Sequence, residues 1–203
     1  AEYVDKMGGL YDVREYDVVV SSGEQSNAGL MALAIQELGI QARSWLGWQI
    51  AIETDDIHGK ARITGIATDE LEKRLANGEI VVVPGFQGIS PANRITTLGR
   101  GGSDLTAVAL AGALNADRCD IYTDVDGIYT TDPRIVAKAQ KLDKITYEEM
   151  LEMASLGSTV FQTRSVELAM NPKLRLQLPP RFPHPPALLP LSQYAILHHP
   201  PST

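Results

Sequence analysis

The sequence predicts an α/β protein: a three-layer α/β/α sandwich with a mainly parallel central sheet. Strand-like and helix-like segments alternate up to residue 178, joined by short turns that contain Gly or Pro, and this alternation is typical of parallel sheets covered by helices. Residues 80–83 are apolar on both faces and end at Pro84-Gly85, as a buried parallel strand does. The 203 residues are 44% hydrophobic and 21% charged, which suits one soluble domain with a sizeable core.

The first half of the chain contains most of the predicted strands. The patterns predict strands at 17–20, within 42–51, at 61–63 and at 80–83, and helices over 25–38 and 69–76. The valines that follow Asp17 favour a strand that ends at Ser21-Ser22-Gly23. Thr68 is placed to cap the second helix, and Asn77-Gly78 to end it.

The second half contains most of the predicted helices. The patterns predict helices over 105–114, from Thr146 to Gly157 and over 159–170, and strands at 119–122 and 173–178. Thr146 and Glu149 have the spacing of a capping box at the start of a helix.

The last segment, residues 179–203, differs in composition from the rest. It holds eight of the twelve prolines and no acidic residue. Proline removes backbone donors, so neither a helix nor a central strand is expected there. We therefore divide the chain into a domain over 1–178 and a proline-rich, disordered or aberrant tail over 179–203.

Composition excludes several classes of function. The net charge of −7 argues against a nucleic-acid partner, and no stretch approaches the roughly 20 apolar residues that span a bilayer. The first residues lack the features of a secretory signal. Cys119 is the only cysteine, which excludes an internal disulfide and a multi-cysteine metal site. The cytoplasm is the expected compartment.

The segment Gly99-Arg100-Gly101-Gly102-Ser103-Asp104 is the strongest candidate for an anion site. Glycines allow backbone N–H groups to approach an anion, and the helix predicted to follow presents its positive end there. Asp104 could be the helix N-cap, could orient a phosphoryl group or could join a Mg²⁺ shell. The alternative is a tight turn with a capping Asp and a surface Arg. Neither a dinucleotide fingerprint nor a Walker P-loop is present.

Residues 122–134 form a second candidate segment, rich in Asp and Thr. A calcium loop does not fit, because Gly127 comes too early and Ile135 occupies the position of the bidentate Glu. An irregular loop that holds a nucleotide fits better, with Tyr129 on the adenosine side and Arg134 near phosphate. A polar turn capped by Asp-Pro is the alternative.

Glu24 is expected at the beginning of a helix, where the dipole stabilises a carboxylate whatever its function. A functional Glu24 would recognise an ammonium group. His58 has no second His or Cys at ligand spacing and is interpreted as a surface or turn residue.

Together these segments resemble aspartate kinases of the amino-acid kinase family. The resemblance extends from about residue 14 to residue 178 and rests on five stretches: Ser22-Gly23-Glu24-Gln25, Pro84-Gly85-Phe86-Gln87-Gly88, residues 96–104, residues 122–134, and Gln162-Thr163-Arg164-Ser165-Val166-Glu167-Leu168-Ala169. It implies MgATP-dependent phosphorylation of the aspartate β-carboxylate, an early step towards lysine, threonine and methionine. Aspartate and ATP would be the ligands, with Mg²⁺ bound to the nucleotide and no metal site of the protein's own.

The resemblance also implies roles for individual residues. Glu24 would bind the α-ammonium group of aspartate and Arg100 its α-carboxylate, while Asp104 would organise the catalytic lysine and the phosphoryl group. The anion site would be lined by Gly101, Gly102 and Ser103. The nucleotide would be held by Thr123, Asp124, Ile128, Tyr129, Thr130, Thr131, Asp132, Pro133, Arg134 and Thr159.

The chain also departs from the pattern of these relatives. They begin with a strand and a Lys-Phe-Gly-Gly-Thr-like loop, which this sequence lacks, and many carry a lysine where Thr159 stands. The alternative function is therefore an inert fragment that at most binds nucleotide or aspartate. Glutamate, acetylglutamate and nucleoside-monophosphate kinases are further alternatives that residues 96–104 disfavour. A homo-oligomer is left open.

Overall fold

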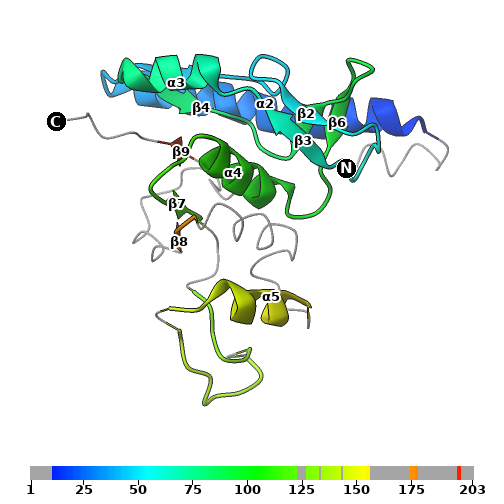
Figure 1. The fold of residues 1–203 in the computed structure, drawn as a ribbon. Helices are drawn as coiled ribbons and strands as arrows, with labels where there is room; N and C mark the ends of the chain where they lie inside the picture. The colour runs from blue at the N-terminus through cyan, green and yellow to red at the C-terminus, as the bar shows by residue number, and fades with distance from the viewer. Residues whose placement is uncertain are drawn as a thin grey trace.

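The computed structural model describes residues 11–122, 127–132, 134–142, 144–155 and 174–177, with the backbone of 196–197. Within these residues, helices cover short strands in an α/β arrangement, as predicted (Figure 1). The helices are α2 (Val13–Glu37), α3 (Asp69–Ala76), α4 (Gly102–Ala113) and α5 (Tyr147–Ser155). The strands are β1 (Ala42–Ser44), β2 (Ile52–Thr54), β3 (Ile63–Ile66), β4 (Ile80–Val82), β5 (Gln87–Ile89), β6 (Ile95–Thr97), β7 (Cys119–Asp120), β8 (Leu176–Gln177) and β9 (Ile196–Leu197).

The strands form three sheets with the orders β1-β4-β9, β3-β2-β5-β6 and β7-β8. The β1–β4, β2–β5 and β7–β8 pairs are parallel. The β2–β3, β4–β9 and β5–β6 pairs are antiparallel. The β5–β6 hairpin, in which Gln87 lies opposite Thr97, was not predicted, because strands of three residues are too short to show a period.

Strand β4 shows how the layers are held together. Val81 and Val83 pack against Leu71 of α3 and Leu110 of α4. Val82, whose side chain points to the opposite face, packs against small residues of α2. All three valines are at most 4% exposed, and each contributes about 1.5–3 kcal/mol by burial. The continuous valine run therefore fills two cores at once, as expected of a strand buried on both faces.

Helix α2 corrects the predicted strand at 17–20 and the predicted helix start at 25. It runs unbroken from Val13, and the Asp12 side chain caps it by accepting from the N–H of Arg14. Its buried stripe consists of small and polar residues: Asp17, Ser21, Ala28 and Ala32. Val18 and Val19 are instead exposed. The apolar pattern was misleading because this helix packs closely through small side chains.

Most other predicted elements are present with shifted ends. Helix α3 has the predicted bounds, although Thr68 makes no side-chain cap bond. The capping box at α5 is confirmed: Glu149 accepts from the N–H of Thr146, and Thr146 Oγ1 accepts from the N–H of Glu149. The predicted helix over 159–170 lies outside the described residues. None of the described helices is long and apolar enough to cross a membrane.

We expect Gly88→Ala to destabilise the fold strongly. A Cβ at Gly88 would lie 2.5 Å from Thr54 Cγ2 and 2.6 Å from the Ile52 carbonyl oxygen. The backbone of β2 cannot yield cheaply, so the free energy of unfolding in urea should fall by about 3 kcal/mol.

The matched control is Gly29→Ala in α2, where an added Cβ meets nothing within 4 Å. Because alanine favours helix over glycine, this variant should be more stable by about 0.5–1 kcal/mol. A similar decrease in the free energy of unfolding in both variants would contradict the close packing of β2 and β5.

Candidate active site

The predicted glycine-rich anion site is the turn between β6 and α4. Gly99 and Gly101 have φ angles of 80° and 71°, in the left-handed region that favours glycine. Gly101 occupies the N-cap position, and α4 begins at Gly102, earlier than the predicted start at 105. Asp104 therefore lies in the first turn of α4, so the N-cap role considered for it is wrong.

The start of α4 leaves two backbone donors available. The N–H of Gly102 donates to the carbonyl of Gly99 at 3.0 Å, and that of Leu105 donates to the carbonyl of Gly101 at 3.1 Å. The N–H groups of Ser103 and Asp104 have no acceptor among the residues that the structure describes. Because they lie at the positive end of a helix, they favour an anion.

The loop between β4 and β5 packs directly on this helix start. A Cβ on Gly85 would lie 3.0 Å from Cα of Ser103, so only glycine allows this approach without movement. The N–H of Phe86 donates to Oγ1 of Thr106 at 3.1 Å, and the carbonyl of Phe86 accepts from the N–H of Leu98 at 2.9 Å. The loop is thus bonded to both sides of the glycine turn.

Gln87 joins the same loop to α2. Its buried side chain accepts a hydrogen bond from Nε2 of Gln25 at 2.8 Å, and its own Nε2 lies 3.4 Å from the carbonyl oxygen of Ser21. The sequence signal for Gln87 was its place in the resembling stretch 84–88, but no role was predicted for it. Through Gln87, the part of α2 around Glu24, the 84–88 loop and the start of α4 form one continuous cluster.

Glu24 lies in the middle of α2, not at the beginning of a helix as expected. The dipole argument therefore does not apply to it. Its side chain is half-buried, and Oε2 is buried without a hydrogen-bond partner among the described residues. This burial raises the pKa of Glu24. An unpaired carboxylate oxygen adjacent to Gln25 is suited to receive an ammonium group.

Asp104 and Arg100 differ in their exposure. Burial raises the pKa of Asp104, whereas Arg100 is exposed and forms no ion pair with the described residues. Burial raises the pKa of the Cys119 thiol in β7 to about 12, and the nearby charges of Asp120 and Asp104 add to the shift.

Part of the predicted nucleotide segment lies outside the described residues, namely Thr123, Asp124, Pro133 and Thr159. The side chain of Ile128 is buried in the core with Val108 and Cys119. Tyr129 forms an antiparallel bridge with Lys141, and the N–H of Thr130 donates to the carbonyl of Gln140 at 2.9 Å. Residues 129–130 thus pair with residues 140–141, and Ile128 anchors this pairing in the core.

Asp132 and Arg134 form a two-pronged ion pair within this loop. Arg134 Nη2 lies 2.8 Å from Oδ2 of Asp132, and Nε lies 3.1 Å from Oδ1. These hydrogen bonds lower the pKa of Asp132. The side chain of Arg134 is 85% exposed, and Thr131 is also exposed. Arg134 is therefore accessible to a phosphate group from solvent.

Two buried polar residues were missed by the sequence reasoning. Asp17 is fully buried and accepts hydrogen bonds from residues of β6 and of the 55–61 loop. His58 lies in a turn, one of the two positions expected for it, but its side chain is only 7% exposed, so the surface interpretation is wrong. Asp17 was missed because the valines that follow it favour a strand. The burial of His58 was missed because its partner, Asp17, is far from it in the sequence.

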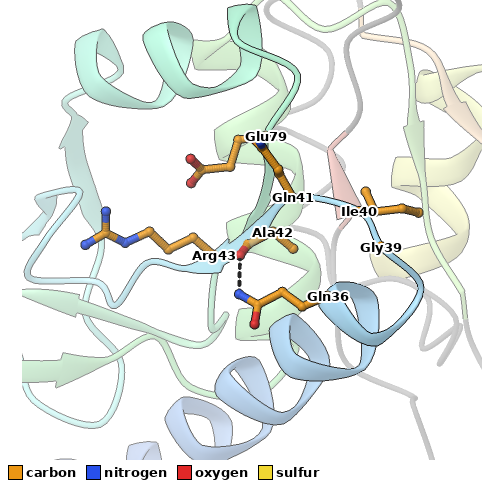
Figure 2. Close-up of a pocket in the computed structure, with 7 residues that line it drawn as sticks. All are labelled: Gln36, Gly39, Ile40, Gln41, Ala42, Arg43 and Glu79. Atoms are coloured by element: carbon orange, nitrogen blue, oxygen red, sulfur yellow. Dashed lines mark hydrogen bonds between the residues drawn. The ribbon is translucent and has the colours of Figure 1, made fainter.

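A separate pocket of about 630 Å³ lies at the other end of the strands (Figure 2). It is lined by residues around the C-terminal end of α2 and the amino ends of β1 and β4, among them Gln36, Arg43 and Glu79. Gln36 Nε2 donates to the carbonyl of Ala42 at 2.7 Å across it. Ligands of parallel sheets bind beyond the carboxyl ends of strands, so this pocket is distinct from the candidate site.

We expect Glu24→Gln to stabilise the protein at alkaline pH. Folding raises the pKa of Glu24, so its contribution is favourable below the unfolded pKa and is lost as the pH rises through the folded pKa. The substitution should raise the free energy of unfolding by about 0.5 kcal/mol at about pH 8, a value reduced for solvent screening.

Urea denaturation at about pH 8 and pH 4 measures this effect, and the gain should shrink at the lower pH. Asp132→Asn is the control with the opposite sign, because folding lowers the pKa of Asp132 and the charged form is favoured above its unfolded pKa. A loss of stability in Glu24→Gln at the higher pH would show that the carboxylate is paired.

Comparison with known proteins places this arrangement in a family. The model of the "Amino acid kinase family" matches residues 3–178. The aspartate kinase of Stutzerimonas stutzeri is 56% identical over 176 residues, covering 87% of this chain and 43% of that protein. This chain thus spans less than half the length of that relative.

Solved structures show the same relationship. The aspartate kinase from Synechocystis superposes with a TM-score of 0.77 at 41% identity, covering 99% of this chain and 32% of that one. Escherichia coli aspartokinase III in complex with aspartate and ADP gives a TM-score of 0.76 at 36% identity, covering 85% of this chain and 39% of that one. The chain therefore belongs to the amino acid kinase family.

Proposed function

We propose that this chain acts as an aspartate kinase, transferring the γ-phosphoryl group of MgATP to the side-chain carboxylate of aspartate. One observation carries the proposal: the unpaired Oε2 of Glu24 belongs to the same packed cluster as the free amides of Ser103 and Asp104. A site with an acceptor for an ammonium group and donors for a carboxylate suits an amino acid. The relative at 56% identity is an aspartate kinase, which supports the choice of substrate.

Each end of the proposed substrate has a counterpart in the site. Glu24 accepts hydrogen bonds from the α-ammonium group. Arg100 and the N–H groups at the start of α4 donate to the α-carboxylate, and Arg100 is suited to a two-pronged contact. Gly101 and Gly102 provide the close backbone approach that this binding requires.

The proposed reaction needs no general base. The β-carboxylate of aspartate is ionised at neutral pH, so one of its oxygens attacks the γ-phosphorus directly. The new O–P bond forms as the bond between the γ-phosphorus and the bridging oxygen breaks, and the electron pair leaves with ADP. The protein contributes by holding two anions together and offsetting their charge. Mg²⁺ enters with the nucleotide and neutralises part of the phosphate charge.

The nucleotide is proposed to bind along residues 123–134 and near Thr159. Within the described part of this segment, Tyr129 is assigned to the adenosine side and Arg134 to a phosphate.

Trapping the product with hydroxylamine tests the reaction. The intact chain, incubated with MgATP and aspartate, should give aspartyl hydroxamate, while glutamate should give none. ATP or aspartate binding in calorimetry without hydroxamate would favour the alternative of a chain that binds but does not turn over. Hydroxamate from glutamate at a similar rate would contradict the assignment of the substrate.

We expect Arg100→Ala to raise the KM for aspartate about 100-fold, because a charge-assisted contact to the α-carboxylate is lost. The KM for ATP should change less than about twofold. Arg62→Ala is the control, because Arg62 is also exposed and forms no ion pair with the described residues. An unchanged KM for aspartate in Arg100→Ala would remove Arg100 from the substrate site.

A further inference from the structure

Asp17 is a fully buried carboxylate that the proposed reaction does not use. Its Oδ1 accepts a hydrogen bond from Oγ1 of Thr97 at 2.6 Å. Its Oδ2 accepts from the N–H of Thr97 at 3.2 Å, from the N–H of Gly59 at 3.2 Å and from Nδ1 of His58 at 2.7 Å. A buried carboxylate is very unfavourable without such donors, so this set of donors is strongly fixed in place.

His58 is held by this carboxylate. A carboxylate only accepts hydrogen bonds, so Nδ1 of His58 is the donor. The other ring nitrogen, Nε2, is buried and has no hydrogen-bond partner among the described residues. Oδ1 of Asp56 lies 3.8 Å from Nε2, beyond hydrogen-bond distance. Within the described ranges, the bond to Asp17 is therefore the one that orients the ring.

The groups bound to Asp17 border both sides of the glycine turn. Thr97 ends β6, and Gly99 follows closely in the chain. Gly59 lies on the other side: a Cβ on Gly99 would be 3.1 Å from its carbonyl oxygen. A further hydrogen bond, from the N–H of Ala61 to the carbonyl of Thr97 at 2.8 Å, joins the 55–61 loop to the end of β6. One carboxylate in α2 thus fixes the strand before the turn and the loop beside it.

We propose that the Asp17–His58 pair is a positioning device that sets the conformation of the glycine turn at 99–101. Through the turn, it sets the place of the Ser103 and Asp104 amides that receive the substrate carboxylate. The identity of that substrate rests on the proposed function, whereas the effect on the turn does not. His58 touches no reacting group in this account and acts only through Asp17 and the turn.

Two substitutions of His58 distinguish the effect of its hydrogen bond to Asp17 from the effect of its side-chain size. In His58→Asn, the side-chain amide places a donor near the position of Nδ1. In His58→Gln, the donor lies near the position of Nε2 and is out of reach of Asp17. The control is Glu15→Gln, which removes the exposed ion pair of Glu15 with Arg94, another link between α2 and the β5–β6 hairpin.

Amide hydrogen exchange on the intact chain gives a readout that needs no substrate. In His58→Gln, the hydrogen-bonded amides of the turn, those of Gly102 and Leu105, should exchange about tenfold faster, with the amides of α3 unchanged. His58→Asn and Glu15→Gln should stay close to the parent chain. The proposal is overturned if amide exchange in the turn is unchanged in His58→Gln or if His58→Asn behaves like His58→Gln. It is also overturned if the amides of α3 exchange faster by the same factor.

Kinetics test the second half of the proposal. His58→Gln should raise the KM for aspartate about tenfold, with kcat and the KM for ATP within about twofold, because the turn serves only the amino acid. A fall in kcat with an unchanged KM for aspartate indicates loss of folded protein and contradicts positioning. If the parent chain neither binds nor phosphorylates aspartate, the proposed function fails, while hydrogen exchange still decides whether the pair holds the turn.

Discussion

The contact between the 84–88 loop and the start of α4 is the constraint on which the candidate site depends. A Cβ at Gly102 would lie 2.9 Å from Cδ2 of Phe86, and one at Gly85 would lie 3.0 Å from Cα of Ser103. The two segments can approach this closely because each contact has a glycine on one side. This approach brings Gln87, and through it α2, to the positive end of a helix whose first amides are free. Without it, Glu24 and the glycine turn would belong to separate surfaces.

Helix α2 carries two carboxylates that differ in their hydrogen bonding. Asp17 is fully buried and receives four hydrogen bonds, so its charge is balanced within the protein. Glu24, about two turns further along the same helix, is half-buried and keeps one oxygen unpaired. Burial costs both groups solvation, but only Asp17 is compensated. The first is therefore structural, and the second is available to a cationic ligand, at some expense of stability.

The sequence predicted the layered class and the glycine turn better than the elements around Glu24. The valines of β4 are apolar on both faces, a pattern that only a buried strand explains, and the structure confirms it. The same rule failed at 17–20, where Val18 and Val19 are exposed on a helix whose buried stripe is small and polar. The pairing of Asp17 with His58 and the bond between Gln25 and Gln87 could not be predicted, because residues far apart in sequence meet only once the sheet has formed.

The central claim is that α2, the 84–88 loop and the start of α4 form one site for an amino acid. Titration of the isotopically labelled chain with aspartate, followed by NMR, tests it most directly. The amides of Ser103 and Asp104 and the side-chain resonances of Glu24 should shift together and saturate at the same aspartate concentration. N-acetyl-aspartate, which lacks the ammonium group, should produce no saturation. Shifts confined to the pocket around Arg43 and Glu79, or unequal saturation at Glu24 and Ser103, would contradict the claim.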